Sequence, residues 1–414
     1  MSGRHKPAAA GPSSRRGFLR RLGLGGAAIA AAPSLPGQGS VGGGATASPS
    51  GLKITDVKVY PWSRAIYVKV ETDDPAVFGW GESSSNSPKQ VVAEFIRHGL
   101  KPIVVGADPL DVEPLWDRMF WENHDLGPAG ALTYAIAGVD LALWDLKGRA
   151  LGLPVHKLLG GSYRDRVPTY CGIPLYAGTV SVEEAVDRAQ RIVDLGFRIV
   201  KLRMQIREYN LNPTPDPTLR YYTAIREALP EEVEVFVDPN EGYTAARAIQ
   251  VGRELADMGM RWFESPCPLE AGDDLRQVVE ALDIAVLAGE KTYTRWQVRD
   301  LIAQANPDVV QPDPIKAGGI TELRKIAALA QAHFKPIAPH NTKPTLGTAA
   351  SLHLLASISN VGPFLEFVEL DTYGEVLPAI RNPLALEDGM LRVPTGPGLG
   401  LEVDEDYVQS VAEG

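Results

Sequence analysis

Seven ionisable residues follow apolar segments of this chain at intervals close to one strand plus one helix. The steps between them are 37, 26, 26, 23, 27 and 26 residues. A βα unit with short loops needs about 25 residues, so each step fits one unit. Residues at the carboxyl ends of barrel strands surround one mouth, where the active site of such a fold lies. The seven residues are Lys201, Asp238, Glu264, Glu290, Asp313, His340 and Glu366.

Three carboxylates come from successive units, namely Asp238, Glu264 and Glu290. Carboxylates that converge near one mouth repel each other strongly unless a cation neutralises them. Ligation by oxygen alone favours a hard ion such as Mg²⁺, with Mn²⁺ as an alternative, over zinc. Any one of the three, taken alone, is better explained as a helix cap or an ion-pair partner. Three in register predict a metal site that leaves room for water and a chelating substrate.

Asp313 and His340 follow the next two predicted strands, and His340 stands in "IAPHN". A carboxylate beside an imidazole orients the ring and stabilises its protonated form. A single histidine is more often structural, but the partner one unit earlier predicts a general acid–base pair.

Two cations, Lys201 and Arg203, stand two positions apart in "VKLRMQ". The run "FRIV" just before them is apolar and β-branched, as a buried strand should be. Side chains at positions i and i+2 of a strand point to the same face. We therefore expect both cations on one face of a buried strand, where they would bind an anion.

The elements that must position these residues are alternating strands and helices from about residue 165 onward. Helical segments such as "TAARAIQVGRELADMG" and "ITELRKIAALAQAH" separate the strands. Eight strands with intervening helices predict a (β/α) barrel over residues 166–375. The strand candidates are "VPTYCGI", "RIVKLRM", "EVFVDPN", "RWFESP", "AVLAGE", "VVQPD", "KPIAPH" and "FLEFVE".

Residues 51–165 predict a separate α+β capping domain. The segments "KITDVKVYP", "AIYVKVETDD" and "VFGWGESSS" alternate apolar and polar residues and are separated by turn residues. Helical patterns follow at about 88–104, 111–122 and 130–150.

Residues 1–50 differ from the rest, with six Lys and Arg and no Asp or Glu. "SSRRGFLRRLGLGGAAIAAAPSL" combines a basic region, a short apolar run and small residues. The apolar run is too short to span a bilayer comfortably, and residues 14–19 resemble the twin-arginine export signal. We expect a signal peptide and linker, and a mature protein in the periplasm or outside the cell, without a membrane anchor. The alternative is a disordered basic tail.

Composition excludes some partners. The formal net charge is −10, and no basic patch with interleaved aromatic residues is visible, which argues against nucleic acid. Cys171 and Cys267 are the two cysteines, so no disulfide framework is possible, and they lack metal-type spacing. We expect buried thiols.

Several motifs together resemble the enolase superfamily, specifically its mandelate racemase-like subgroup. The strand ends "VDPNEGY", "WFESP", "AGE", "QPD", "AGGIT" and "APHNT" occur in that family's order. "AIAGVDLALWDLKGRALGLPVHKLLGG" is similar to the mandelate racemase/muconate lactonising family signature. The residues of this segment that carry the likeness are Asp140, Trp144, Asp145, Gly148 and Pro154.

The resemblance implies a modified (β/α)₇β barrel, a capping domain, and a C-terminal segment, residues 376–414, that packs back on the cap. It also implies roles for single residues. Asp238, Glu264 and Glu290 would bind Mg²⁺, and His340 with Asp313 would be the base. Lys201 would face the substrate carboxylate, Asn240 would contact a hydroxyl, and Glu366 would hydrogen-bond a carboxylate oxygen. Such barrels commonly assemble, which implies a homo-oligomer.

Arg203 departs from the subgroup pattern, in which many members have a lysine that serves as a second base. An arginine stays protonated near any physiological pH, so Arg203 is a poor base and a good bidentate clamp on a carboxylate or hydroxyl. A racemase or epimerase needs acid–base groups on both faces of the reacting carbon. Because Arg203 is a poor base, the sequence favours these two activities less. A dehydratase needs proton abstraction on one face and an acid for the leaving hydroxyl, and His340 can serve as both if the leaving group lies on its face.

We therefore expect a lyase that converts an aldonate or aldarate to a 2-keto-3-deoxy acid through an enolate. An epimerase or a sugar-lactone cycloisomerase is the alternative within the superfamily, and a non-catalytic acid-sugar binding protein is the alternative outside catalysis. Which acid sugar is bound depends on loops of the cap and barrel. The candidate contacts there are Trp62, Arg64, Trp80, Tyr176, Arg207 and Tyr209.

Overall fold

The structure, a computed structural model, describes residues 50–62, 65–84, 88–175, 180–204, 206, 210–368, 374 and 376–412. The chain divides by its internal contacts into Met1–Ala47 and Ser48–Gly414. All elements of the fold and all residues of the candidate site belong to the second unit. Among the described residues, no helix combines the length and the apolar character that crossing a bilayer requires.

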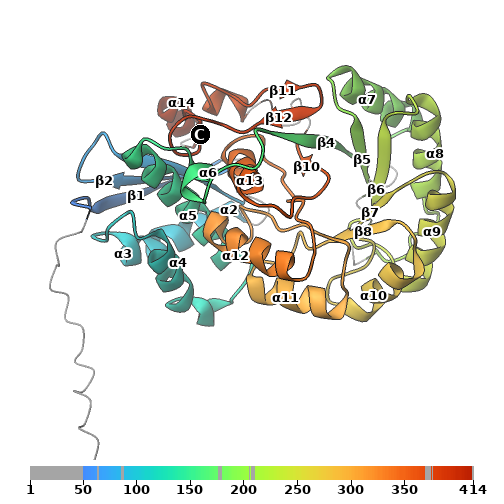
Figure 1. Cartoon of the computed structure of the whole chain (residues 1–414), viewed down its shortest axis with the longest axis horizontal. Coiled ribbons are helices and arrows are strands. Elements are labelled where there is room, and N and C mark those ends of the chain that lie inside the picture. Colours follow the sequence, from blue (N-terminus) through green and yellow to red (C-terminus); the bar gives the residue numbers. More distant parts are fainter. Residues whose placement is uncertain are drawn as a thin grey trace, which may run out of the picture. The chain divides into compact units, whose positions relative to one another are not determined.

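The capping domain is built on an antiparallel sheet of three strands in the order β1-β2-β3 (Figure 1). The residues of β1 alternate in burial as predicted. Val57 and Val59 are buried, and the residues on either side of them are less buried. The strands are β1 (Ile54–Pro61), β2 (Ile66–Thr72) and β3 (Phe78–Ser83).

The long helix α5 (Ala131–Leu151) packs directly on β3 and is buried along most of its length. Two glycines of β3 permit this contact, because a Cβ added to Gly79 or Gly81 would lie 2.1 Å from a carbonyl oxygen of α5. The shorter helical elements of the cap are α2 (Lys89–Glu94), η1 (Phe95–Leu100), α3 (Lys101–Val104), α4 (Val112–Trp121), η2 (His124–Leu126) and α6 (Val155–Leu158).

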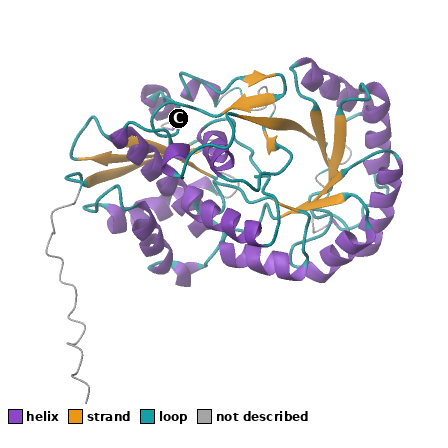
Figure 2. Cartoon of the chain, in the orientation of Figure 1, coloured by secondary structure: helices purple, strands orange, loops and turns teal. Residues whose placement is uncertain are grey.

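The barrel strands lie inside a series of helices, as Figure 2 shows. The order β4-β5-β6-β7-β8-β9 is parallel throughout. Its strands are β4 (Arg166–Pro174), β5 (Ile199–Arg203), β6 (Glu234–Asp238), β7 (Trp262–Glu264), β8 (Ala285–Ala288) and β9 (Val309–Val310).

One helix follows each of these strands, and α13 follows the seventh strand position. The apolar stripe of α7 illustrates why they cover the barrel, since Ala185, Ala189 and Ile192 are its buried residues. The helices are α7 (Val182–Asp194), α8 (Thr218–Ala228), α9 (Ala245–Asp257), α10 (Gly272–Ala281), α11 (Arg295–Gln304), α12 (Gly319–Ala332) and α13 (Leu346–Ser357).

The barrel closes through short contacts. The segment "KPIAPH", predicted as a strand, is reduced to isolated parallel bridges that Ile337 makes with Val310 and Val361. β10 (Leu365–Glu366) then pairs in parallel with β4. The prediction of a modified (β/α)₇β barrel with an N-terminal α+β capping domain is confirmed.

The C-terminal residues contact both the barrel and the cap. β11 (Leu386–Glu387) and β12 (Met390–Arg392) form a hairpin, and β12 pairs antiparallel with β4. The short helix η5 (Leu377–Ala379) and α14 (Glu405–Ala412) lie against the cap, where Val408 joins its apolar core.

Candidate active site at the barrel mouth

The predicted residues lie at the carboxyl ends of their strands, and all but Arg203 are buried. Lys201 lies two residues before Arg203, which ends β5, while Asp238 ends β6 and Glu264 ends β7. The other four follow or end later strand positions of the barrel, namely Glu290, Asp313, His340 and Glu366. The structure thus brings the seven regularly spaced residues to one end of the barrel.

Lys201 is the centre of a carboxylate cluster. Its Nζ lies 2.6 Å from Glu264 Oε1, 3.0 Å from Glu366 Oε1 and 3.6 Å from Asp238 Oδ2. It also donates to the Tyr170 hydroxyl at 3.2 Å. Burial alone would lower the pKa of Lys201, but Glu264 and Glu366 raise it well above its ordinary value. Lys201 is therefore a fixed positive charge within the barrel mouth.

The three carboxylates predicted to bind a metal have different surroundings, since His340 and Lys316 hold the pKa of Glu290 well below its usual range against the effect of burial. Burial and the adjacent charge of Glu264 raise the pKa of Asp238 well above its usual range. In the described part of the chain, no three His, Cys, Asp or Glu side chains are grouped so that they could hold a metal ion as they stand. Instead Glu264 bonds to Lys201, and Glu290 Oε2 lies 3.0 Å from His340 Nε2. The all-oxygen donor set and the elevated Asp238 pKa fit a hard divalent cation.

His340 and Asp313 form the predicted pair. His340 Nδ1 lies 2.7 Å from Asp313 Oδ2, and the backbone N–H of Ile315 donates to Asp313 Oδ1 at 2.9 Å. The contact with Asp313 fixes the orientation of the imidazole ring, so that its Nε2 faces Glu290. Burial and Lys316 lower the pKa of His340, but Glu290, Glu366 and Asp313 together raise it to about 9.

Glu366 and Asn240 complete the mouth. The backbone N–H of Asn341 donates to Glu366 Oε2 at 2.9 Å. Asn240 donates to Asp238 through its backbone N–H at 2.8 Å and through Nδ2 at 3.1 Å. Arg203 Nε donates to Asn240 Oδ1 at 3.0 Å. Arg203 is therefore linked to a predicted metal ligand through one amide side chain.

The backbone after β6 and β7 is strained. Asn240, Glu241 and Ser265 have φ values of 53°, 63° and 40°, although none is glycine. Such left-handed residues cost free energy and gather at functional sites. Glu241 is also buried and pairs with Lys291.

Four contacting residues were not predicted from the sequence. Lys316 Nζ lies 3.4 Å from His340 Nδ1, and Gln311 Nε2 donates to Glu264 Oε2 at 3.1 Å. Tyr170 and Asn341 bond to Lys201 and Glu366 as described above. Lys316 and Gln311 stand in "QPDPIK" beside Asp313. Their closeness to this predicted acid in the sequence is the feature that could have pointed to them.

The predicted substrate contacts in the cap have packing roles where they are described. Trp80 is buried with its ring centroid 5.7 Å from that of Tyr60, and Trp62 packs edge-on against Tyr407 of α14. Cys171 and Cys267 are buried and are not joined in a disulfide, as predicted. The other candidate contacts lie outside the described residues, namely Arg64, Tyr176, Arg207 and Tyr209.

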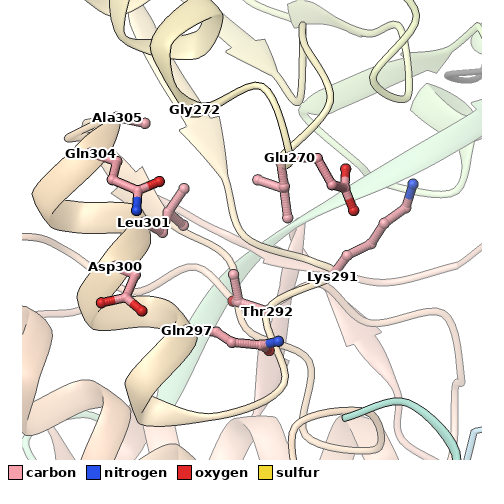
Figure 3. Close-up of a pocket in the computed structure, with 10 residues that line it drawn as sticks. Glu270, Gly272, Lys291, Thr292, Gln297, Asp300, Leu301, Gln304 and Ala305 are labelled. Carbon is pink, nitrogen blue, oxygen red and sulfur yellow. The ribbon is translucent and has the colours of Figure 1, made fainter.

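A separate cavity of about 220 Å³ lies between α11 and the segments after β7 and β8 (Figure 3). Lys291, Thr292 and Gln297 line it together with Glu270. None of the predicted site residues is part of its lining.

Comparisons with known proteins agree with this architecture. A family profile described as "Mandelate racemase / muconate lactonizing enzyme, N-terminal domain" matches residues 47–160, and one described as "Enolase C-terminal domain-like" matches residues 184–407. The chain is 32% identical to a D-galactonate dehydratase of Verminephrobacter eiseniae, over 86% of this chain and 94% of that protein. It is 31% identical to a D-galactarolactone cycloisomerase of Agrobacterium fabrum, over 82% of this chain and 89% of that protein.

A solved structure of similar fold is a mandelate racemase/muconate lactonizing protein from Paracoccus denitrificans complexed with magnesium. It has a TM-score of 0.81 and 36% identity, and the match covers 87% of this chain and 98% of that one. Both domains are thus matched in sequence, and the fold is matched in space. The chain belongs to the mandelate racemase/muconate lactonizing enzyme family of the enolase superfamily.

Proposed function

We propose that this protein is a Mg²⁺-dependent acid-sugar dehydratase, a lyase that converts an aldonate or aldarate to a 2-keto-3-deoxy acid. The observation that carries the proposal is the buried His340–Asp313 pair beside the carboxylate cluster. The names of relatives from several organisms support the same reaction class, since they include D-galactonate, arabinonate and D-xylonate dehydratases.

Asp238, Glu264 and Glu290 are the residues that would hold the metal, with Mn²⁺ as an alternative ion. A bound divalent cation supplies positive charge that offsets the second negative charge created when a proton leaves the carbon next to a carboxylate. The similar structure complexed with magnesium supports this choice. Lys201 adds a fixed positive charge on the same side, where a substrate carboxylate would approach.

In its neutral form, His340 would take the proton from the carbon next to the carboxylate through Nε2, because Nδ1 is held by Asp313. The electron pair then forms the enolate, and its collapse expels the β-hydroxyl. His340 would return the proton to that leaving group, so that water departs. The resulting enol becomes the 2-keto-3-deoxy acid. Glu366 and Asn240 would contact the carboxylate and a hydroxyl of the substrate.

The cation at position 203 favours elimination over racemisation. Arg203 stays protonated and is held by Asn240, so it offers a clamp for the substrate and no second base. A cycloisomerase is the second candidate, because relatives include a D-galactarolactone cycloisomerase and the solved structure of a 3,6-anhydro-D-galactonate cycloisomerase from Zobellia galactanivorans.

A product assay separates these possibilities. The protein would be incubated with Mg²⁺ and D-galactonate, D-xylonate, arabinonate or D-galactarolactone, and the products followed by ¹³C NMR. A 2-keto-3-deoxy acid formed from D-galactonate, D-xylonate or arabinonate with loss of water supports the dehydratase, whereas isomerisation of D-galactarolactone alone, without loss of water, supports the cycloisomerase. Binding of these compounds without any product would leave only a binding protein and contradict the proposal.

We further propose that residues 1–50 direct export by the twin-arginine route. The support is the sequence "SRRGFL" and the absence of acidic residues in this segment. Fusing residues 1–50 to a reporter that folds before export tests this. The reporter should leave the cytosol, and replacing Arg15 and Arg16 with Lys should retain it there; equal export of both fusions would contradict the proposal.

A further inference from the structure

Glu82 is a buried carboxylate that reaches from the cap into the barrel. It lies on β3, is 0% exposed, and accepts hydrogen bonds through Oε2 from Thr345 Oγ1 at 2.8 Å and from the Gly347 backbone N–H at 2.9 Å. Its Oε1 is buried and has no hydrogen-bond partner among the described residues. A buried carboxylate that makes so few bonds is costly, which suggests a role beyond packing.

The bonds of Glu82 hold the start of a barrel helix. Thr345 is the N-cap residue of α13, and its own side chain makes no capping bond within that helix. Glu82 instead accepts a hydrogen bond from a backbone N–H of the first turn, at the positive end of the helix dipole. The loop 341–345, which connects His340 to α13, is thereby fixed at its far end by a residue of the cap.

A second bond from the same strand end reaches the partner of His340. The backbone N–H of Ser84 donates to the Ile315 carbonyl at 3.3 Å. The N–H of Ile315 in turn donates to Asp313 Oδ1, while Asp313 Oδ2 contacts His340 Nδ1. The end of β3 therefore contacts the loops that carry both members of the acid–base pair.

These loops meet the cap in a tightly packed interface. A Cβ added to Gly347 would lie 3.1 Å from Ile315 Cγ2 and 3.6 Å from Glu82 Oε2. Ile315 and Leu346 belong to the apolar core of the cap although they lie in the barrel. A shift of Glu82 or Ser84 at the end of β3 must therefore move the loops around His340, because the close packing leaves no room for independent movement.

We infer that Glu82 is a positioning residue through which the capping domain holds Asp313 and His340 in reactive geometry. This inference rests on the proposed function, since it assigns the pair as acid and base. The cap would then contribute to proton transfer through a buried interface with the barrel. A small displacement of a general base is enough to lower the rate, so loss of this support should appear in kcat more than in KM.

Asp145 provides a matched control for a purely structural role. It is a fully buried carboxylate that accepts from the backbone N–H groups of Trp80 at 2.9 Å and Leu399 at 2.8 Å, and it pairs with Arg149 at 2.7 Å. Asp145 thus binds β3, the strand that carries Glu82. None of its contacts named here involves the loops around His340. Loss of Asp145 should lower stability without a specific loss of proton transfer.

The test compares Glu82→Met, Glu82→Gln, Thr345→Val and Asp145→Asn with the wild type, below the unfolding temperature of each variant. With the substrate that reacts among D-galactonate, D-xylonate and arabinonate, Glu82→Met should lower kcat by about tenfold or more with little change in KM. Glu82→Gln should recover most of the activity, because its amide oxygen can accept both bonds. The kcat of Thr345→Val should lie between those of the wild type and Glu82→Met. This variant also provides the comparison if Glu82→Met does not fold.

Two further readouts separate positioning from stability. Amide hydrogen exchange of residues 340–348 should accelerate in Glu82→Met and not in Asp145→Asn, whether or not a substrate has been found. On an Asp313→Asn background, Glu82→Met should cause little additional loss of kcat, because both changes act on His340. Wild-type kcat in folded Glu82→Met, unchanged exchange in the 340–348 segment, or equal losses in Glu82→Met and Asp145→Asn would overturn the inference. Absence of any reaction in the wild type would count against the proposed function alone.

Discussion

At the scale of single residues, Arg203 distinguishes this site most clearly from one with two bases. Its Nε donates to Asn240 Oδ1, and Asn240 in turn donates to Asp238. The guanidinium is therefore placed by a residue that also orients a predicted metal ligand. A lysine would offer a point charge and a proton that can be released, and neither reproduces the planar fork of arginine.

Replacing Arg203 with Lys should therefore weaken substrate binding more than it slows the reaction. We expect KM to rise by about tenfold, which corresponds to ~1.4 kcal/mol of lost binding, with a smaller change in kcat. Steady-state kinetics on the preferred acid sugar provides the measurement. Arg198→Lys, at the residue just before the start of the same strand, should leave both constants unchanged. An unchanged KM of Arg203→Lys would contradict the assigned role.

At the scale of secondary-structure elements, the close contact of β3 with α5 determines where Glu82 and Ser84 lie. Gly81 has no room for a side chain, because an added Cβ would be 2.1 Å from the Gly138 carbonyl oxygen. Gly99 is different, since its nearest neighbour would be the Phe95 ring at 3.2 Å.

Gly81→Ala should therefore destabilise the protein by about 3 kcal/mol or more, as expected for a clash with backbone in a packed interior. Gly99→Ala should cost less, because the Phe95 ring can turn aside. Urea unfolding followed by circular dichroism compares the two. Similar stabilities of both variants would show that β3 and α5 can separate without cost.

Asp140 of α5 gives a prediction for pH. It is fully buried and accepts from the Thr321 backbone N–H at 3.1 Å, and burial raises its pKa to about 7 against these hydrogen bonds. An acid whose folded pKa is raised stabilises the fold below its unfolded pKa, near 3.8, and loses that contribution as pH rises toward 7. Asp140→Asn cannot ionise. The wild type should therefore lose more free energy of unfolding between about pH 5 and pH 8 than this variant, and parallel pH curves would contradict the assignment.

The elements themselves were largely predictable, because each rests on local pattern. Alternation predicted β1 to β3, and apolar runs ending in a charged residue predicted the barrel strands. The segment "KPIAPH" is the exception, with a single bridging residue, Ile337. Strand length there depends on hydrogen-bond partners from distant segments, which a local pattern does not contain.

The same limit applies to the site. Spacing predicted which strand ends meet, because a barrel brings them to one face. It did not predict Tyr170 beside Lys201, or Lys316 beside His340, since those contacts depend on side-chain directions. Glu82 was missed for the same reason, as its partner Thr345 is 263 residues away in the chain.

At the scale of the whole molecule, the carboxylate cluster predicts that a divalent cation stabilises the fold. Mg²⁺ that binds only the folded state adds ~2.7 kcal/mol at a concentration of 100 times its Kd. Thermal unfolding should therefore shift upward with added Mg²⁺ and return after chelation. Asp238→Asn should abolish the shift, whereas Asp300→Asn, in the separate cavity of Figure 3, should retain it. An equal shift in both variants would place the ion elsewhere.

The most direct test of the proposed chemistry is exchange of the proton next to the substrate carboxylate. The wild type and His340→Asn would be incubated in D₂O with Mg²⁺ and each acid sugar, and deuterium incorporation into substrate and product followed by ¹H NMR. We predict that the wild type forms a 2-keto-3-deoxy product and that His340→Asn, while still binding Mg²⁺, shows neither exchange nor product. Exchange that persists in folded His340→Asn would assign the base to another residue and contradict the account.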